Sequence, residues 1–183
     1  MALNATVHTF EITLNDADRG VYESLEFRVA RHPSETAEYL VTRVLAYCLE
    51  FTEGLAFSKG GLSDPDTAAL EIRDLTGALQ SWIEIGSPEA ARLHKAAKAA
   101  RRVVVYSHKD VTSLLERLRL EHVYRADQIE IYAIDRDFLA TLAVQLDRRM
   151  RFDLSVSERE LYVSLGEETL SGAVTAHRVG ESK

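Results

Sequence analysis

The residue with the clearest chemical potential is Glu84, the one acid in the otherwise apolar segment Trp82-Ile83-Glu84-Ile85-Gly86. An ionised carboxylate held away from water without a partner costs several kcal/mol, so Glu84 needs a cation, a metal ion or an opening to solvent. Asp66 lies upstream, across an expected hairpin, and offers a second carboxylate for the same region. Two acids that converge at a strand end predict a site for a divalent metal ion.

The geometry of the expected hairpin decides which acid can face Glu84. If the chain reverses near Thr76, Glu84 lies opposite a position near residue 68, which is close to Asp66. Asp74 lies near the turn, and each strand residue between it and Glu84 adds about 3.3 Å to their separation. We therefore expect Asp66 to be the partner of Glu84 and Asp74 to be a turn residue.

A structural role for both acids is the alternative. Asp66 would then cap a loop, and Glu84 would pair with Arg73 or with another cation across the sheet. Asp64 is the fallback for the second carboxylate, because the sequence does not fix the register of the hairpin to a single residue.

Basic groups for the site would come from the helix that is expected over residues 88–101. Its apolar stripe includes Leu93, and at 100° per residue Arg92 lies about 100° and Lys95 about 160° from that residue. Arg92 is therefore the better placed of the two, on the flank of the helix. The alternative is that both side chains are solvated helix charges.

If the site binds a metal ion, Mg²⁺ or Mn²⁺ would be held by Asp66 and Glu84 and would keep several waters in its coordination shell. The ion would lower the pKa of a bound water and neutralise charge on a phosphate group. Lys95 or Arg92 would steady the attacking water or the transition state. Glu38 borders the apolar face of the first expected helix and is the candidate for an outer metal ligand.

The order of expected elements predicts a mixed α/β fold. Alternating apolar residues indicate an N-terminal hairpin over residues 6–14 and 21–29. Ser34 is expected to cap a helix that runs to about Phe51. The apolar run Val103-Val104-Val105-Tyr106 predicts a central, buried strand in a parallel arrangement. The other expected elements are strands near 55–57, 68–74, 78–86, 128–134 and three between 152 and 178, a bend at Lys59-Gly60-Gly61, and helices over 88–101, 110–121 and 136–147.

Length and composition fit one globular domain over residues 1–183, in which the terminal strands, 1–31 and 149–178, add a mainly antiparallel layer. Apolar residues form 46% and charged residues 28% of the chain, which is an ordinary mixture. The formal charge of −7 argues against wide contact with phosphates, although a local basic face is compatible with it. The one cysteine, Cys48, excludes an internal disulfide. No segment approaches the roughly 20 apolar residues that span a bilayer, which predicts a cytoplasmic protein with no membrane partner.

Residues 34–106 are expected to run helix, strand, strand, strand, helix, strand, and this order resembles the core of the PD-(D/E)XK nuclease superfamily. In that superfamily an aspartate at the second strand and an acid in the third bind the metal ion, and a lysine follows two residues later. Asp66, which follows Pro65, and Glu84 match the two acids. Gly86 stands at the position of the lysine, so a basic group would have to come from elsewhere.

More narrowly, the chain resembles the YaeQ family over nearly its full length. The resemblance is carried by Ala30-Arg31-His32-Pro33-Ser34-Glu35-Thr36, Asp74-Leu75-Thr76-Gly77, Trp82-Ile83-Glu84-Ile85-Gly86, Pro88, Arg92-Leu93-His94-Lys95-Ala96 and Val103-Val104-Val105-Tyr106. It implies a variant of the nuclease fold with additional β strands, and it puts Lys95 where a relocated lysine could serve.

Two functions follow as expectations. The first is a metal-dependent, nuclease-like phosphodiesterase that acts on nucleic acid, which the pairing of Asp66 with Glu84 favours. The second is a catalytically degenerate nuclease-fold module that binds a protein or nucleic-acid partner in a regulatory role. The missing lysine and the acidic composition favour the second.

Overall fold

The computed structural model describes residues 4–58, 64 and 66–180. Its contacts divide the chain into two compact units, Met1–Val41 with Ile134–Thr175 and Thr42–Ala133 with Ala176–Lys183. Each unit therefore combines segments that are distant in the sequence. The expectation of a single domain over residues 1–183 stays a prediction.

The first unit contains five strands, which follow the order β2-β1-β8-β9-β10 among the described residues. Their bounds are β1 (Thr6–Asp16), β2 (Val21–Arg31), β8 (Arg149–Ser157), β9 (Glu160–Leu165) and β10 (Glu168–His177). Strand β1 pairs parallel with β8, while the pairs β1–β2, β8–β9 and β9–β10 are antiparallel. The mainly antiparallel pairing predicted for the N- and C-terminal strands is thus confirmed.

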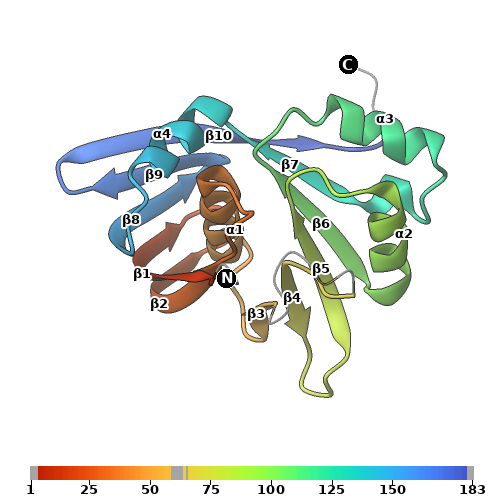
Figure 1. Ribbon diagram of the computed structural model, residues 1–183, viewed down its shortest axis with the longest axis horizontal. Coiled ribbons are helices and arrows are strands. Elements are labelled where there is room, and N and C mark those ends of the chain that lie inside the picture. The colour runs from red at the N-terminus through yellow and green to blue at the C-terminus, as the bar shows by residue number, and fades with distance from the viewer. Residues whose placement is uncertain (1–3, 59–63, 65, 181–183) are drawn as a thin grey trace. The chain divides into compact units, whose positions relative to one another are not determined.

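Helix α4 (Arg136–Val144) packs against β10 in this unit (Figure 1). The carboxylate of Asp135 caps the helix by accepting a hydrogen bond from the backbone N–H of Phe138 at 2.8 Å. A Cβ atom on Gly172 of β10 would lie 2.5 Å from Cβ of Phe138. Only glycine therefore lets the helix and the strand approach this closely.

Helix α1 spans Ala37–Leu49, so the predicted start at Ser34 is wrong. The hydroxyl of Thr36 accepts the backbone N–H of Tyr39 at 3.1 Å and caps the helix instead. The Ser34 hydroxyl is hydrogen-bonded to the His32 ring, 2.6 Å from Nδ1, and is therefore not free to cap the helix. The apolar stripe of α1 is buried as predicted and includes Leu40, Val41, Val44, Leu45 and Cys48.

The second unit contains five strands in the order β7-β6-β5-β4-β3, again among the described residues. Their bounds are β3 (Leu55–Phe57), β4 (Leu70–Arg73), β5 (Leu79–Ile85), β6 (Arg102–Ser107) and β7 (Glu130–Ile134). The pairs β3–β4 and β4–β5 are antiparallel, while β5–β6 and β6–β7 are parallel. The prediction of a central parallel strand at 103–106 is confirmed.

Helices α2 (Ala90–Ala99) and α3 (Thr112–Leu120) lie on the same side of β5 and β6 (Figure 1). Side chains alternate along a strand, so one face of β5 and β6 turns Trp82, Val103 and Val105 toward these helices. The helices contribute the buried residues Ala90, Leu93, Ala96, Ala97, Leu114 and Leu118 to the same core. The residues from α2 in this core form the apolar stripe that was predicted for that helix.

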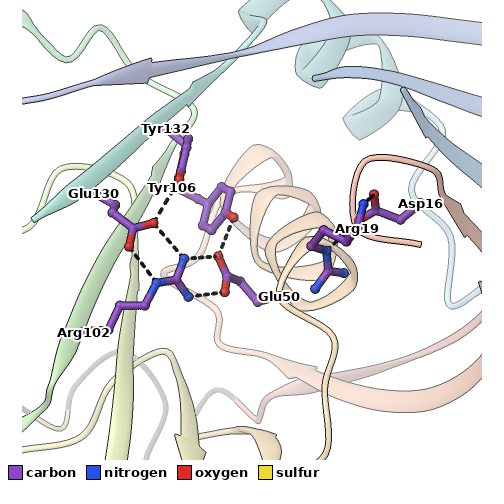
Figure 2. Close-up of polar contacts among 7 residues, drawn as sticks. All are labelled: Asp16, Arg19, Glu50, Arg102, Tyr106, Glu130 and Tyr132. Atoms are coloured by element: carbon purple, nitrogen blue, oxygen red, sulfur yellow. Dashed lines mark hydrogen bonds and ion pairs between the residues drawn. The ribbon is translucent and has the colours of Figure 1, made fainter. Parts of the chain in front are cut away.

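The opposite face of β6 carries a polar cluster, here called the Arg102 network, which Figure 2 shows. The Arg102 guanidinium donates to Glu50 at 2.5 Å from Nη1, and to Glu130 at 2.7 Å from both Nε and Nη2. The Tyr106 hydroxyl donates to Glu50 at 2.7 Å, and the Tyr132 hydroxyl donates to Glu130 at 2.9 Å. Glu50 directly follows α1, so the network ties the end of that helix to β6 and β7.

Electrostatics in the Arg102 network follow from burial and from the shared cation. Burial is the main reason why the pKa of the Tyr106 phenol lies well above its ordinary value, and the Glu50 carboxylate raises it further. The hydrogen bonds from Arg102 hold the pKa of Glu130 below its ordinary value. Glu50 and Glu130 therefore share the Arg102 guanidinium as their cation.

Within residues 4–58, 64 and 66–180, no helix combines the length and the apolar character that crossing a membrane requires.

Candidate functional site at the start of helix α2

Glu84 lies on β5 with its side chain turned toward α2, and the residue is only 4% exposed. Its Oε1 atom accepts hydrogen bonds from Trp82 Nε1 at 2.5 Å and from Arg92 Nε at 2.7 Å. The Arg92 guanidinium also lies 5.9 Å from the centre of the Trp82 ring, which adds a cation–π contact. The cation that this buried acid requires is therefore Arg92.

Arg92 contacts three oxygen atoms, which together are called the oxygen cradle. Besides Glu84 Oε1, its Nη1 donates to the backbone carbonyl of Asp64 at 3.2 Å and its Nη2 donates to the backbone carbonyl of Thr67 at 2.6 Å. A carboxylate and two carbonyls are the kind of ligands that a hard divalent cation takes. They also suit the planar, five-donor guanidinium, which fills the cradle here.

The pKa of Glu84 lies above its ordinary value because burial disfavours the charged form. The positive charge of Arg92 and the hydrogen bonds from Trp82 and Arg92 act in the opposite direction and are outweighed. Burial of the ionised Glu84 carboxylate thus costs free energy, and the hydrogen bonds from Trp82 and Arg92 offset part of that cost.

We expect the contribution of Glu84 to stability to fall as the pH rises. A group with a raised pKa binds more protons in the folded than in the unfolded protein, so stability declines above the unfolded value of 4.5 and until the folded pKa is passed. The measurement is the difference in unfolding free energy between the wild type and Glu84→Gln, by urea denaturation from about pH 4 to pH 8. If Glu84 instead stabilised the wild type more strongly as the pH rose, the charge of Arg92 would outweigh the effect of burial.

Asp66 lies at the surface, where its side chain is 71% exposed and accepts a hydrogen bond from Lys95 Nζ. It stands in a turn ahead of β4, not at the start of that strand, because β4 begins at Leu70. Its backbone N–H donates to the Asp64 carboxylate at 2.9 Å, so Asp64 caps this turn. The loop cap that the structural alternative gave to Asp66 is therefore made by Asp64.

The four predicted residues Asp66, Glu84, Arg92 and Lys95 gather around α2, but as two separate ion pairs. Lys95 neutralises Asp66, and Arg92 neutralises Glu84. In the described part of the chain, no group of three His, Cys, Asp or Glu residues could hold a metal ion. A divalent ion does not fit the oxygen cradle while the Arg92 guanidinium occupies it.

The hairpin that carries Glu84 has the predicted register. Leu70 pairs with Ile83, which puts Ala69 opposite Glu84 and next to the expected position. Asp74 is the turn residue, as predicted, and its carboxylate accepts the backbone N–H groups of Thr76 at 2.9 Å and Ala78 at 3.0 Å.

Three other expectations concern residues around the site. Arg73 does not pair with Glu84, because it bonds Glu71 on its own strand. The expected bend at Lys59-Gly60-Gly61 and the position of Pro65 lie outside the described residues. Glu38 belongs to the first unit, in the first turn of α1, and its role as an outer metal ligand stays a prediction.

Sequence reasoning missed two parts of the site. The hydrogen bond from Trp82 to Glu84 could have been anticipated, since residues two apart on a strand share a face. The carbonyls of Asp64 and Thr67 could not, because a main-chain acceptor has no signature in the sequence.

Comparison with known proteins gives a consistent family assignment. The family model described as YaeQ protein matches residues 1–174. The uncharacterized protein YaeQ of Escherichia coli (strain K12) is 27% identical over 177 residues, which cover 96% of this chain and 97% of that protein. Its counterpart from Salmonella typhi is 28% identical over 179 residues, with the same shares of both chains.

Solved structures agree with the sequence matches. The crystal structure of the YaeQ protein from Pseudomonas syringae has a TM-score of 0.87 and 33% identity, and the match covers 97% of both chains. The crystal structure of the YaeQ protein from Xanthomonas axonopodis pv. citri has a TM-score of 0.85 and 29% identity, with 96% of this chain and 99% of that chain covered.

Proposed function

The chain belongs to the YaeQ family, and we propose that it is a cytoplasmic nucleic-acid-binding module in which Arg92 takes the place of a catalytic metal ion. The fold in this proposal is a catalytically degenerate variant of the PD-(D/E)XK nuclease fold. The observation that carries it is the oxygen cradle, whose three acceptors are all bonded by one side chain of the protein itself.

A filled cradle argues against hydrolysis for an electrostatic reason. The Arg92 guanidinium is always charged in proteins, so it balances Glu84 whenever that carboxyl is ionised. A divalent ion in the same place would have to displace it and would meet strong repulsion from it at close range. The second acid, Asp66, is paired with Lys95. The site therefore reaches neutrality without a cofactor.

The positive charge along α2 favours nucleic acid as the ligand. Residues 90–102 contain five Lys and Arg residues and no acid, in a chain whose formal charge is −7. Lys95 and Lys98 lie three residues apart on α2, which makes them neighbours on one face, and Arg101 follows just beyond the helix end. All three are exposed. This basic stripe, Lys95, Lys98 and Arg101, is suited to the phosphates of a nucleic-acid strand.

A metal-dependent phosphodiesterase is the second candidate function. It is favoured by the convergence of two acids and two bases from distant segments on one end of α2. In this alternative, Mg²⁺ or Mn²⁺ would be held by Asp66 and Glu84 after Arg92 had left the cradle. Because the residues as they stand do not fit such an ion, the binding module ranks first.

The experiment measures binding and cleavage in parallel. Labelled single- and double-stranded DNA and RNA oligonucleotides are titrated with the wild type, Lys98→Gln and Arg101→Gln by fluorescence anisotropy. We expect each substitution to weaken binding of all sequences alike. It should also reduce, by about one, the slope of the logarithm of the binding constant against the logarithm of the salt concentration. Arg28→Gln, an exposed arginine of β2 in the first unit, is the matched control and should change neither quantity.

The same oligonucleotides are incubated with Mg²⁺ or Mn²⁺ and with the wild type or Glu84→Gln. The proposal predicts no cleavage by either protein. Cleavage that needs the metal ion and is lost in Glu84→Gln would establish the phosphodiesterase instead. Failure of every oligonucleotide to bind would contradict the proposed ligand and would favour a protein partner in a regulatory role.

A further inference from the structure

A small surface depression lies beyond the C-terminal end of α2, away from the oxygen cradle. Its polar lining is Arg101, Arg125 and Gln128, and its apolar lining includes Ala97, Val103 and Ile129. These residues all belong to the second unit. The depression is called the Arg101–Arg125 pocket.

The two arginines carry charge that the surrounding structure does not balance. Neither guanidinium has an ion-pair partner within the described residues, unlike Arg92 and Arg102. Arg125 instead lies 5.0 Å from the centre of the Tyr124 ring, a contact that orients the guanidinium without neutralising it. The negative end of α2 also faces this region, but its partial charge of about half an elementary charge is outweighed by two full positive charges.

The segment that presents Arg125 is held in a costly conformation. His122 and Arg125 have φ angles of 48° and 50°, in the left-handed region that residues other than glycine rarely adopt. Each such residue costs about 1 to 2 kcal/mol. Strain of this kind persists where the surrounding contacts enforce it, and it is common at binding sites.

Two hydrogen bonds enforce this conformation. The backbone N–H of Tyr124 donates to Nδ1 of His94 on α2 at 3.1 Å, which fastens the segment to the helix. The backbone N–H of Gln128 donates to the carbonyl of Arg125 at 2.9 Å and closes the turn. The backbone that presents Arg125 is therefore fixed before any ligand binds, which lowers the entropic cost of binding.

We propose that the Arg101–Arg125 pocket binds one phosphate group. Guanidinium groups offer paired donors that match phosphate oxygens, and the Gln128 amide supplies a further donor. The inference rests on the proposed function for the source of that phosphate, the backbone of a strand that follows the basic stripe from Lys95 to Arg101. Free phosphate offers the same chemistry, so the two sources are separated by experiment.

The test uses the full chain and two ligands, inorganic phosphate and a labelled single-stranded oligonucleotide. Phosphate binding is followed by the backbone amide signals of Arg101, Arg125 and Gln128 in NMR spectra. Arg101→Gln and Arg125→Asn should each weaken binding of both ligands about tenfold, the loss expected for a charged hydrogen-bonding group. Asparagine tolerates the left-handed region, so Arg125→Asn removes the charge without opposing the backbone. Arg119→Gln, on the exposed side of α3, is the matched control.

The outcomes separate this inference from the proposed function. If Lys98→Gln weakens oligonucleotide binding while Arg101→Gln and Arg125→Asn leave both ligands unchanged, the pocket inference is overturned and the binding module stands. If phosphate shifts the pocket signals in an arginine-dependent way but no oligonucleotide binds, the pocket is confirmed with free phosphate as its ligand, and the proposed function fails. Phosphate that shifts no pocket signal also overturns the inference.

Discussion

Replacement of Arg92 by methionine is expected to lower the free energy of unfolding by about 3 to 5 kcal/mol, the range for removing one partner of a buried ion pair. The change leaves Glu84, which is 4% exposed, with Trp82 Nε1 as its one remaining side-chain donor within the described residues. It also leaves the carbonyls of Asp64 and Thr67 without their guanidinium donor. Urea denaturation at neutral pH measures the loss, and methionine keeps a similar length.

Two companion variants identify the cause of this loss. Lys98→Met removes a charge from the exposed side of the same helix and should change stability by less than about 0.5 kcal/mol. Arg92→Met combined with Glu84→Gln removes both charges and should recover at least half of the loss, since the uncompensated charge is then gone. A double variant no more stable than Arg92→Met would mean that Arg92 acts through packing and not through Glu84.

Replacement of Arg102 by methionine is expected to cost about 2 to 4 kcal/mol, somewhat less than a fully buried pair because Arg102 and Glu130 partly reach water. The variant leaves two carboxylates, Glu50 and Glu130, facing each other without their shared cation. Thermal or urea unfolding measures the loss. Arg151→Met, which breaks an exposed pair with Glu11 in the first unit, is the control and should have a small effect.

The pH dependence of the Arg102 variant has a definite sign. In the wild type the lowered pKa of Glu130 contributes stability that is present above the unfolded value of 4.5 and is lost as the pH falls through the folded pKa. In Arg102→Met, the two carboxylates repel each other, so protonation relieves the variant. The difference between the two proteins should therefore shrink from neutral to acidic pH. A difference that grows as the pH falls would contradict the role given to Arg102.

Much of the fold follows from local patterns in the sequence. The order of elements between α1 and β6, the parallel position of β6 and the turn at Asp74 were all predicted, because side-chain periodicity and glycine placement carry that information. The start of α1 was predicted wrongly. Two hydroxyl residues, Ser34 and Thr36, could cap it, and the choice depends on a contact with His32 that periodicity does not reveal.

The candidate site was predicted in its residues but not in its pairing. The helical wheel placed Arg92 on the flank of α2, and that position is what allows it to reach Glu84. The sequence also brought Asp66 into the same region. It could not show that each acid would receive its own cation, because that depends on the path of the main chain ahead of β4. The carbonyls that complete the oxygen cradle lie on that path.

We propose that the oxygen cradle accepts one cation and that Arg92 is that cation. A Mn²⁺ titration followed by electron paramagnetic resonance tests it on the wild type, Arg92→Ala, and Arg92→Ala combined with Glu84→Gln. Trp82 is the only tryptophan, so quenching of its fluorescence shows whether a bound ion lies at this site. We predict that the wild type leaves Mn²⁺ free, that Arg92→Ala binds one ion and quenches Trp82, and that the double variant binds none. A wild type that binds one Mn²⁺ and quenches Trp82, with Arg92 still in place, would contradict this role of Arg92.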